Sequence, residues 1–95
     1  MDSLVELNAS KWLTYKCAWQ HDQKQDVTQD VAVAKLYASE MVNRVVDRVV
    51  QVHGGEGWVR GPLERLYRRV RAMRIAEGTS EIQKVIIADT LGLGR

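Results

Sequence analysis

The sequence predicts an all-α protein, an antiparallel bundle of about four helices that forms a single domain over residues 1–95. Apolar residues recur at three- and four-residue intervals through most of the chain, and no segment alternates as a half-buried strand does. The glycines gather at a few junctions, and Pro62 is the only proline, so the long segments between them carry no helix breaker. A chain of this length is enough for one domain and not for two.

The first predicted helix covers about residues 2–22 and ends in the polar run HDQKQD. Its apolar residues recur at three-, four- and five-residue spacing, which places them in one stripe on a helix. We expect Trp12 and Trp19 to pack in the core. The alternative is that a helix this rich in Trp and Tyr has a face covered by something absent from this chain. The stripe consists of Leu4, Leu7, Trp12, Tyr15, Ala18 and Trp19.

The second predicted helix begins at Thr28, a suitable N-cap, and continues to about His53. Its segment NRVVDRVVQV is rich in valine, which favours strands. Helical spacing nevertheless gathers the valines on one face and leaves Asp47 and Arg48 outside. The pair Gly54–Gly55 is the expected end of the helix. The shared face consists of Val42, Val45, Val46, Val49 and Val50, and it is extended backwards by Ala34, Ala38 and Met41.

The third predicted helix begins at RGPLERLYRRVRAMRI, with Pro62 just inside its start, where the missing N–H costs nothing. One side of this helix is apolar and the other is rich in arginine. The net charge is only +2 and no aromatic residue interleaves with the arginines, so no nucleic-acid partner is predicted. The apolar stripe is Leu63, Leu66, Tyr67, Val70 and Met73, and the outward arginines are Arg65, Arg68, Arg69 and Arg71.

The fourth predicted helix begins at Thr79 or Ser80, with Ser80 and Gln83 in the register of a capping box. The connection that precedes it, residues 77–79, is a tight turn. Gly92 and Gly94 mark the expected end of the helix. Its expected inner face consists of Ile82, Val85, Ile86 and Leu91.

The composition, 45% hydrophobic and 27% charged, is that of an ordinary soluble globular protein. No stretch is long and apolar enough to span a membrane, and no signal peptide opens the chain, so we expect neither a membrane location nor secretion. Cys17 is the only cysteine, which excludes an internal disulfide and a thiolate metal cluster and suits a reducing compartment. We predict no metal site.

Two glycine-bearing junctions are the candidate ligand sites. In QVHGGEGW, residues 51–58, the glycines could let a backbone approach a ligand, although local pattern favours a helix cap and a loop. In EGTSEIQ, Gly78 permits a sharp turn, and Thr79, Ser80 and the first N–H groups of the next helix suit an anion. Glu77 precedes them. A carboxylate shielded from water there would be a stronger base, whereas local pattern alone favours an exposed acid that complements the helix dipole.

The stretch QVHGGEGWVRGPLERLYRRVRAMRIAEGTSEIQK resembles the C-terminal signature of acyl-CoA dehydrogenases. The family pattern is a Gln-x-x-Gly-Gly-x-Gly stretch, a Pro-Leu-Glu-Arg-type helix start, a Tyr-Arg-Asp-x-Arg-like helix and a Glu-Gly-Thr-Ser-Glu-Ile-Gln turn. These motifs occur here in order and at family spacing. The resemblance covers about residue 4 to the end and is most specific from Gln51 to Gln83.

The resemblance implies a helical domain that completes the FAD site of a larger enzyme. That enzyme would remove an α-proton from an acyl-CoA thioester while the β-hydride passes to FAD, and an electron-transfer flavoprotein would then take the electrons. It implies Glu77 as the α-proton base and Gly78 as the residue that lets the thioester approach. By the same matching, FAD of a neighbouring subunit would contact Gln51, Val52, His53, Gly54 and Gly55, and FAD of the same subunit would contact Thr79, Ser80 and Glu81.

The sequence also departs from the family pattern. Arg69 stands where the family has Asp, which removes any ion pair that the Asp makes, and Ala76 stands where many relatives have Tyr, which would widen the acyl pocket. The preceding helical domain and β-domain are absent, and so is the helix that opens the family's C-terminal bundle. We therefore expect a fragment, or a cloned domain, that is inactive alone. Acyl chain length and branching stay open.

The resemblance also implies an oligomeric state and a compartment, and two alternative functions stay open. The parent enzyme would be a homo-oligomer, cytoplasmic in a bacterium or in the mitochondrial matrix of a eukaryote. One alternative is an acyl-CoA oxidase that uses the same flavin frame. The other is a freestanding helical oligomerisation module that kept the signature as scaffold, with an apolar face left to bury.

Overall fold

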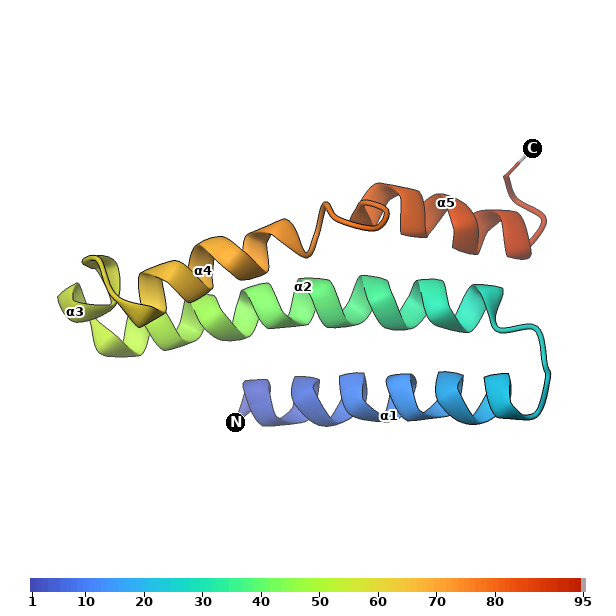
Figure 1. The fold of residues 1–95 in the computed structure, drawn as a ribbon, viewed down its shortest axis with the longest axis horizontal. Helices are drawn as coiled ribbons and strands as arrows, with labels where there is room; N and C mark the ends of the chain where they lie inside the picture. The colour runs from blue at the N-terminus through green and yellow to red at the C-terminus, as the bar shows by residue number, and fades with distance from the viewer. Residues whose placement is uncertain (95) are drawn as a thin grey trace.

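The computed structural model describes residues 1–94 and contains five α-helices (Figure 1). They are α1 (Asp2–Asp22), α2 (Thr28–His53), α3 (Gly55–Trp58), α4 (Pro62–Ala72) and α5 (Ser80–Thr90). The predicted all-α fold and the bounds of the first two helices are confirmed. None of the helices in this part of the chain is both long enough and apolar enough to cross a membrane.

The helices lie in one flat layer with α2 at its centre, and the molecule measures 46 × 27 × 19 Å (Figure 1). Helix α1 runs antiparallel to α2 on one side. Helices α4 and α5 follow one another along the opposite side of α2. Since α2 packs against every other helix, its side chains can reach both α1 and the junction between α4 and α5.

The short helix α3 was not predicted, because three glycines in four residues are typical of a loop. It forms because Gly57 packs directly on α2. A Cβ atom at Gly57 would lie 2.7 Å from the Val50 carbonyl oxygen, so only glycine fits there. The helix therefore depends on a tertiary contact that local pattern does not reveal.

The hydrophobic core is small and centred on α2, with Ala32, Met41, Val46 and Val70 buried. The expectation that Trp12 and Trp19 pack in it is wrong, because their exposed fractions are 65% and 59%. The apolar stripe of α1 points away from α2. The less exposed side of α1 is mostly polar and consists of Ser3, Glu6, Ser10, Leu13, Cys17 and Gln20.

Ion pairs connect the inward, mostly polar side of α1 to α2. Glu6 contacts Arg48 at 2.9 Å and Arg44 at 3.3 Å, and these pairs tie the start of α1 to the second half of α2. The hydrogen bond from Arg48, followed by the influence of Arg44, lowers the pKa of Glu6. Lys16 and Asp30 make a further pair at 3.2 Å near the other end of α1. The inward side of α1 is thus complementary in charge to α2.

The predicted inner face of α5 is also largely wrong. Ile82, Val85 and Leu91 are exposed, whereas Ser80 and Gln83 are buried. On α4, Val70 is buried as expected, and the outward arginines are exposed as predicted, but three stripe residues stay partly exposed: Leu66, Tyr67 and Met73. The chain therefore exposes apolar residues on several helices.

Helix starts differ in detail from the predictions. Thr28 is the first residue of α2 and not its N-cap; the Asp26 carboxylate accepts its backbone N–H at 3.0 Å and its hydroxyl at 2.7 Å. Thr79 is the N-cap of α5, since its hydroxyl oxygen accepts the Ile82 backbone N–H at 3.2 Å. The capping box of Ser80 and Gln83 does not form, because the Ser80 hydroxyl donates to Glu40 and the Gln83 amide donates to carbonyl oxygens of the preceding turn.

Candidate functional site

The connection between α4 and α5 is longer than predicted. Helix α4 ends at Ala72, so residues 73–79 all belong to the connection rather than residues 77–79 alone. The Ile75 and Ala76 backbone N–H groups donate to the Ala72 carbonyl oxygen, and the Ser80 N–H donates to the Arg74 carbonyl oxygen at 3.1 Å. The chain thus folds back on itself just before α5.

Glu77 lies at the sharpest point of this connection. Its φ is +57°, in the left-handed region that non-glycine residues rarely adopt, and the φ of Gly78 is +96°. The Glu77 side chain is exposed, and its carboxylate makes no hydrogen bond or ion pair with residues 1–94. The enclosure that would shield this acid from water is therefore not supplied by the part of the chain that the structure describes.

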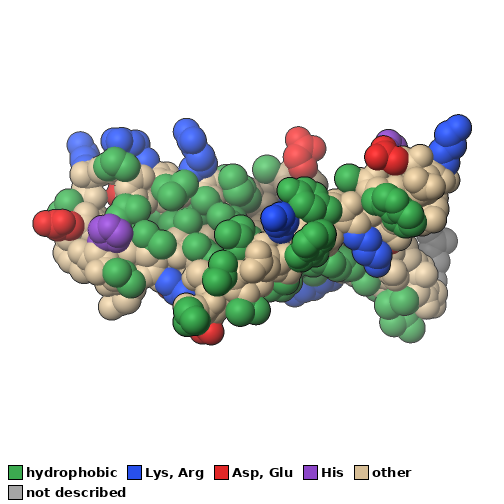
Figure 2. Space-filling view, turned by 90° about the horizontal axis from the view of Figure 1, so that it is seen from below, with side chains coloured by type: hydrophobic (Ala, Val, Ile, Leu, Met, Phe, Trp, Pro, Cys, Tyr) green, Lys and Arg blue, Asp and Glu red, His purple; other side chains and the backbone are tan. Residues whose placement is uncertain are grey.

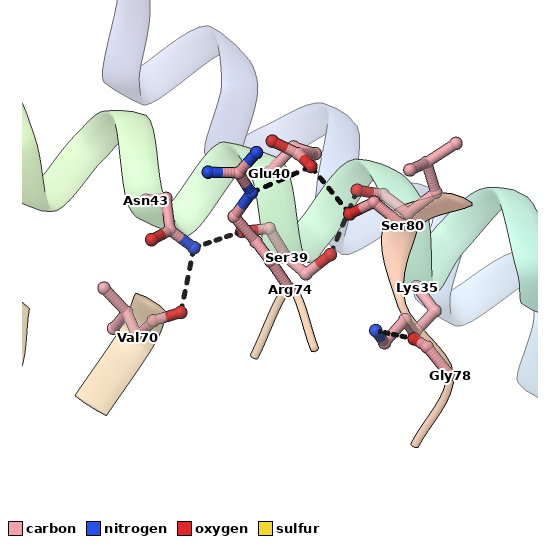
Figure 3. Close-up of polar contacts among 9 residues, drawn as sticks. Lys35, Ser39, Glu40, Asn43, Val70, Arg74, Gly78 and Ser80 are labelled. Carbon is pink, nitrogen blue, oxygen red and sulfur yellow. Dashed lines mark hydrogen bonds and ion pairs between the residues drawn. The ribbon is translucent and has the colours of Figure 1, made fainter. Parts of the chain in front are cut away.

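The backbone of the turn is held by two side chains. The Lys35 ammonium, from α2, donates to the Gly78 carbonyl oxygen at 2.5 Å (Figure 3). The Gln83 amide, from α5, donates to the carbonyl oxygens of Glu77 and Gly78, both at 3.4 Å. The carbonyl oxygens of Glu77 and Gly78 are therefore both anchored, while the Glu77 carboxylate makes no hydrogen bond or ion pair with residues 1–94.

A second contact ties both ends of the connection to α2. One Glu40 oxygen, Oε1, accepts the Ser80 hydroxyl at 2.6 Å and the Arg74 Nε–H at 3.0 Å (Figure 3). The hydrogen bond from Ser80, and then the contact with Arg74, lowers the pKa of the Glu40 carboxyl. Nearby, the Asn43 amide donates to the Val70 carbonyl oxygen at 2.8 Å and so holds the end of α4.

The other residues predicted at this junction have different surroundings. Thr79 uses its hydroxyl to cap α5, and Glu81 is exposed in the first turn of that helix. Ser80 is only 4% exposed, and its hydroxyl is engaged by Glu40. Ala76 and Arg69 are exposed. Of the residues predicted to contact a ligand at this junction, Glu77 and Glu81 are thus the two with exposed side chains.

The first glycine-bearing junction forms the end of α2. Gln51, Val52 and His53 belong to its last turn and are exposed, and Gly54 has a φ of +59°. The His53 ring nitrogen Nδ1 lies 2.9 Å from the Val49 carbonyl oxygen, so this histidine has a backbone partner. No atom lies within 4 Å of a Cβ position built on Gly54 or Gly55, and their backbone is therefore open to solvent.

A groove of about 640 Å³ lies beside this junction and is lined partly by Gln51. Trp58, Arg60 and Arg68 also line it, and none of the three was predicted as a site residue. Trp58 is 82% exposed, and Arg60 has no ion pair within residues 1–94. Asp47 and Glu64 line the groove as well, and Glu64 pairs with Arg68 at 2.9 Å. The Arg60 guanidinium and the exposed indole suit a ligand that combines a phosphate with an aromatic ring. Trp58, a large aromatic residue that follows the glycines, is the sequence feature that could have indicated this groove.

The structure does not bring the two junctions together. They lie at opposite ends of α4, whose 11 residues span about 16 Å (Figure 1). One chain therefore presents two separate candidate surfaces, an open carboxylate on a strained turn and a groove with both arginine and carboxylate side chains beside open glycines.

Comparisons with known proteins bear directly on this arrangement. The family profile described as "Acyl-CoA dehydrogenase, C-terminal domain" matches residues 1–92. The chain is 40% identical over 91 residues to the probable acyl-CoA dehydrogenase YngJ of Bacillus subtilis, covering 95% of this chain and 24% of that protein. Identity is also 40% over 91 residues, with the same coverage, to the subunit CarC of a caffeyl-CoA reductase–Etf complex from Acetobacterium woodii.

A solved structure shows the same fold. The FAD complex of PigA superposes with a TM-score of 0.89 at 36% identity, over 94% of this chain and 24% of that one. The chain thus spans about a quarter of the length of the relatives it matches. With the family profile matched from residue 1 to residue 92, the chain belongs to the acyl-CoA dehydrogenase family and corresponds to its C-terminal domain.

Proposed function

We propose that the chain works as the C-terminal helical domain of a longer, FAD-dependent acyl-CoA dehydrogenase. The observation that carries this proposal is Glu77, an acid without a partner among residues 1–94, on a strained turn that α2 and α5 hold in place. Stored strain and a free titratable group at one residue are typical of functional sites. The family signature around this residue supports the same reading.

In this proposal the Glu77 carboxylate takes the α-proton of an acyl-CoA thioester. Such a proton is only weakly acidic, so the base must be aimed at it and shielded from water. The turn directs the Glu77 carboxylate toward the α-proton, and the rest of the enzyme shields this carboxylate from water. Gly78 has no side chain to obstruct a thioester that approaches the carboxylate.

The residues at both junctions fit FAD. Arg60 suits its phosphates and Trp58 suits an aromatic ring, next to the open backbone of Gly54 and Gly55, whereas Arg68 in the same groove pairs with Glu64. We propose that Gln51, Val52 and His53 complete this contact, and that Thr79, Ser80 and Glu81 approach a second FAD. When bound, FAD accepts the β-hydride. The separation of the two junctions along α4 supports their assignment to flavins of two different subunits.

The proposed enzyme also has an electron acceptor, a compartment and an oligomeric state. The relative CarC belongs to a complex that contains an Etf, which supports an electron-transfer flavoprotein as the electron acceptor. We place the parent enzyme in the cytoplasm of a bacterium or in the mitochondrial matrix of a eukaryote, as a homo-oligomer. Slow reaction of the reduced flavin with oxygen would separate this dehydrogenase from an oxidase.

The domain reading is tested by measuring FAD affinity in two proteins. The isolated chain is expected to bind FAD weakly, because one groove and one turn supply few of the contacts that a tight site needs. A full-length dehydrogenase that carries residues 1–95 as its C-terminal segment is expected to hold FAD and oxidise an acyl-CoA. Submicromolar affinity of the isolated chain for FAD would contradict the expectation that the rest of the enzyme supplies most of the FAD contacts. A full-length protein without FAD or activity would contradict the function.

One observation favours a second function, oligomerisation. The outer face of α1, which consists of Leu4, Leu7, Trp12, Tyr15 and Trp19, is more than half exposed at every one of these residues. Figure 2 views the molecule from below and shows hydrophobic side chains gathered over its left and central parts, with Lys or Arg side chains among them and other atoms over much of the right part. Apolar surface of this extent is typical of an interface between proteins.

We therefore expect the isolated chain to self-associate through the outer face of α1. Light scattering after size exclusion should give a mass above that of one chain, and the mass should fall as the protein is diluted. Replacing both Trp12 and Trp19 with Gln should give a monomer, since these two side chains contribute much of the apolar area. Trp58→Gln is the matched control, because Trp58 is even more exposed, at 82%, but lies on α3. A wild-type monomer at all concentrations would exclude oligomerisation by this face.

A further inference from the structure

We infer that Lys35 is a positioning residue for Glu77. It lies on α2, far from the glycine-bearing turn in sequence, and its ammonium donates to the Gly78 carbonyl oxygen at 2.5 Å. The inference rests on the proposed function of Glu77 as a base. It assigns to Lys35 the task of keeping the turn in the one conformation that aims this carboxylate.

The conformation of the turn needs such support. A non-glycine residue with a left-handed backbone costs roughly 1–2 kcal/mol, and Glu77 has a φ of +57°. Gly78 follows with a φ of +96°, and glycine can leave this region at little cost. Without external contacts, the two residues would therefore relax together, and the direction of the Glu77 side chain would change with them.

Lys35 supplies the strongest of the contacts that oppose this relaxation. Its hydrogen bond is charge-assisted and short, whereas the two bonds from Gln83 to the same turn measure 3.4 Å each. The Lys35 side chain is partly buried, which limits competition from water. The Gly78 carbonyl has two lone pairs, so Lys35 and Gln83 can both donate to it.

The neighbouring contact at Glu40 acts on different atoms. It holds the Ser80 hydroxyl and the Arg74 side chain, and so it fixes the two ends of the connection (Figure 3). It does not touch the Glu77–Gly78 segment between those ends. Loss of Lys35 is therefore expected to loosen the turn while leaving α5 docked on α2 through Glu40.

The test is Lys35→Met in the full-length dehydrogenase that carries this domain, because methionine keeps most of the stem and removes the donor. We expect kcat to fall about ten- to a hundredfold, since misplacing a catalytic group by an ångström has effects of this order. KM for the acyl-CoA and the FAD content should stay near wild type. Lys35→Arg, which keeps a charged donor, should recover part of the rate.

A structural readout accompanies the kinetics. A crystal structure of the Lys35→Met enzyme should show Glu77 with a φ that has left the left-handed region. Lys16→Met is the matched control, because Lys16 also contacts α2, through Asp30, but lies on α1 away from the turn. Its kcat should be that of the wild type.

Each outcome decides between the two proposals. A Lys35→Met enzyme with wild-type kcat and an unchanged φ at Glu77 overturns the positioning role, even when Glu77 itself proves essential. A variant that loses FAD or assembly together with its rate shows a merely structural lysine and also overturns it. If Glu77→Gln retains turnover, the function of Glu77 fails instead, and the φ of Glu77 in the Lys35→Met structure still reports whether Lys35 holds the turn.

Discussion

Replacing Glu77 with glutamine in the full-length dehydrogenase is expected to lower turnover by about 10²–10⁴-fold, the range that a positioned general base contributes. Glutamine has nearly the same shape, but its amide cannot take the α-proton. FAD content should be unchanged, because the Glu77 carboxylate makes no contact that holds the turn: Lys35 and Gln83 bind backbone oxygens. Steady-state oxidation of a saturated acyl-CoA and the flavin absorbance of the purified enzyme measure the two quantities.

The matched control is Asp89→Asn, since Asp89 is another exposed acid, near the far end of α5. Its turnover should equal that of the wild type, which shows that loss of a surface charge alone has no effect. Near-normal turnover of the Glu77→Gln enzyme would assign the base to another residue. The proposed role of the turn would then be limited to shape.

Local periodicity was sufficient to predict the four longer helices but not α3, because helical spacing and breakers are properties of neighbouring residues. The bounds of α2 followed from valine spacing and from Gly54–Gly55. Periodicity was not sufficient to predict which side of a helix faces inward. On α1 the apolar stripe faces out, while Glu6 on the opposite side pairs with arginines of α2, and a contact between two helices cannot be seen in the spacing of one.

The candidate site likewise contains residues that the sequence predicts and residues that it does not predict. Glu77 and Gly78 could be predicted because a recognisable motif contains them, and the structure shows a positive φ at Gly78, where a sharp turn was predicted. The positive φ of Glu77 was not predicted. Lys35 and Glu40 could not be predicted, since they reach the turn from the middle of a helix whose register against α5 depends on packing. Ser80 was predicted as a ligand contact, but no local pattern indicated that its hydroxyl would bind Glu40.

Gly78→Ala is expected to damage both stability and catalysis. At a φ of +96°, any side chain strains the backbone, and a Cβ atom would also lie 2.7 Å from the Gln83 Nε2 atom, which anchors the turn. We expect the free energy of unfolding to fall by about 1–3 kcal/mol, the cost of a residue in an unfavourable region. We also expect turnover to fall further than this loss explains, because Gln83 must move and release the Glu77 carbonyl. Thermal unfolding and steady-state rates of the full-length enzyme test both effects.

Two other glycines separate the causes of that damage. Gly92 has a φ of +75° and nothing within 4 Å of a Cβ position, so Gly92→Ala carries backbone strain without crowding. Gly61 is extended and its nearest atom lies 4.0 Å away, so Gly61→Ala should change neither stability nor turnover. If Gly78→Ala behaves like Gly92→Ala and loses stability but keeps its rate, crowding at Gln83 is without consequence for Glu77. A selective loss of turnover in Gly78→Ala instead means that the proton-abstracting side chain depends on the backbone geometry that Lys35 and Gln83 maintain.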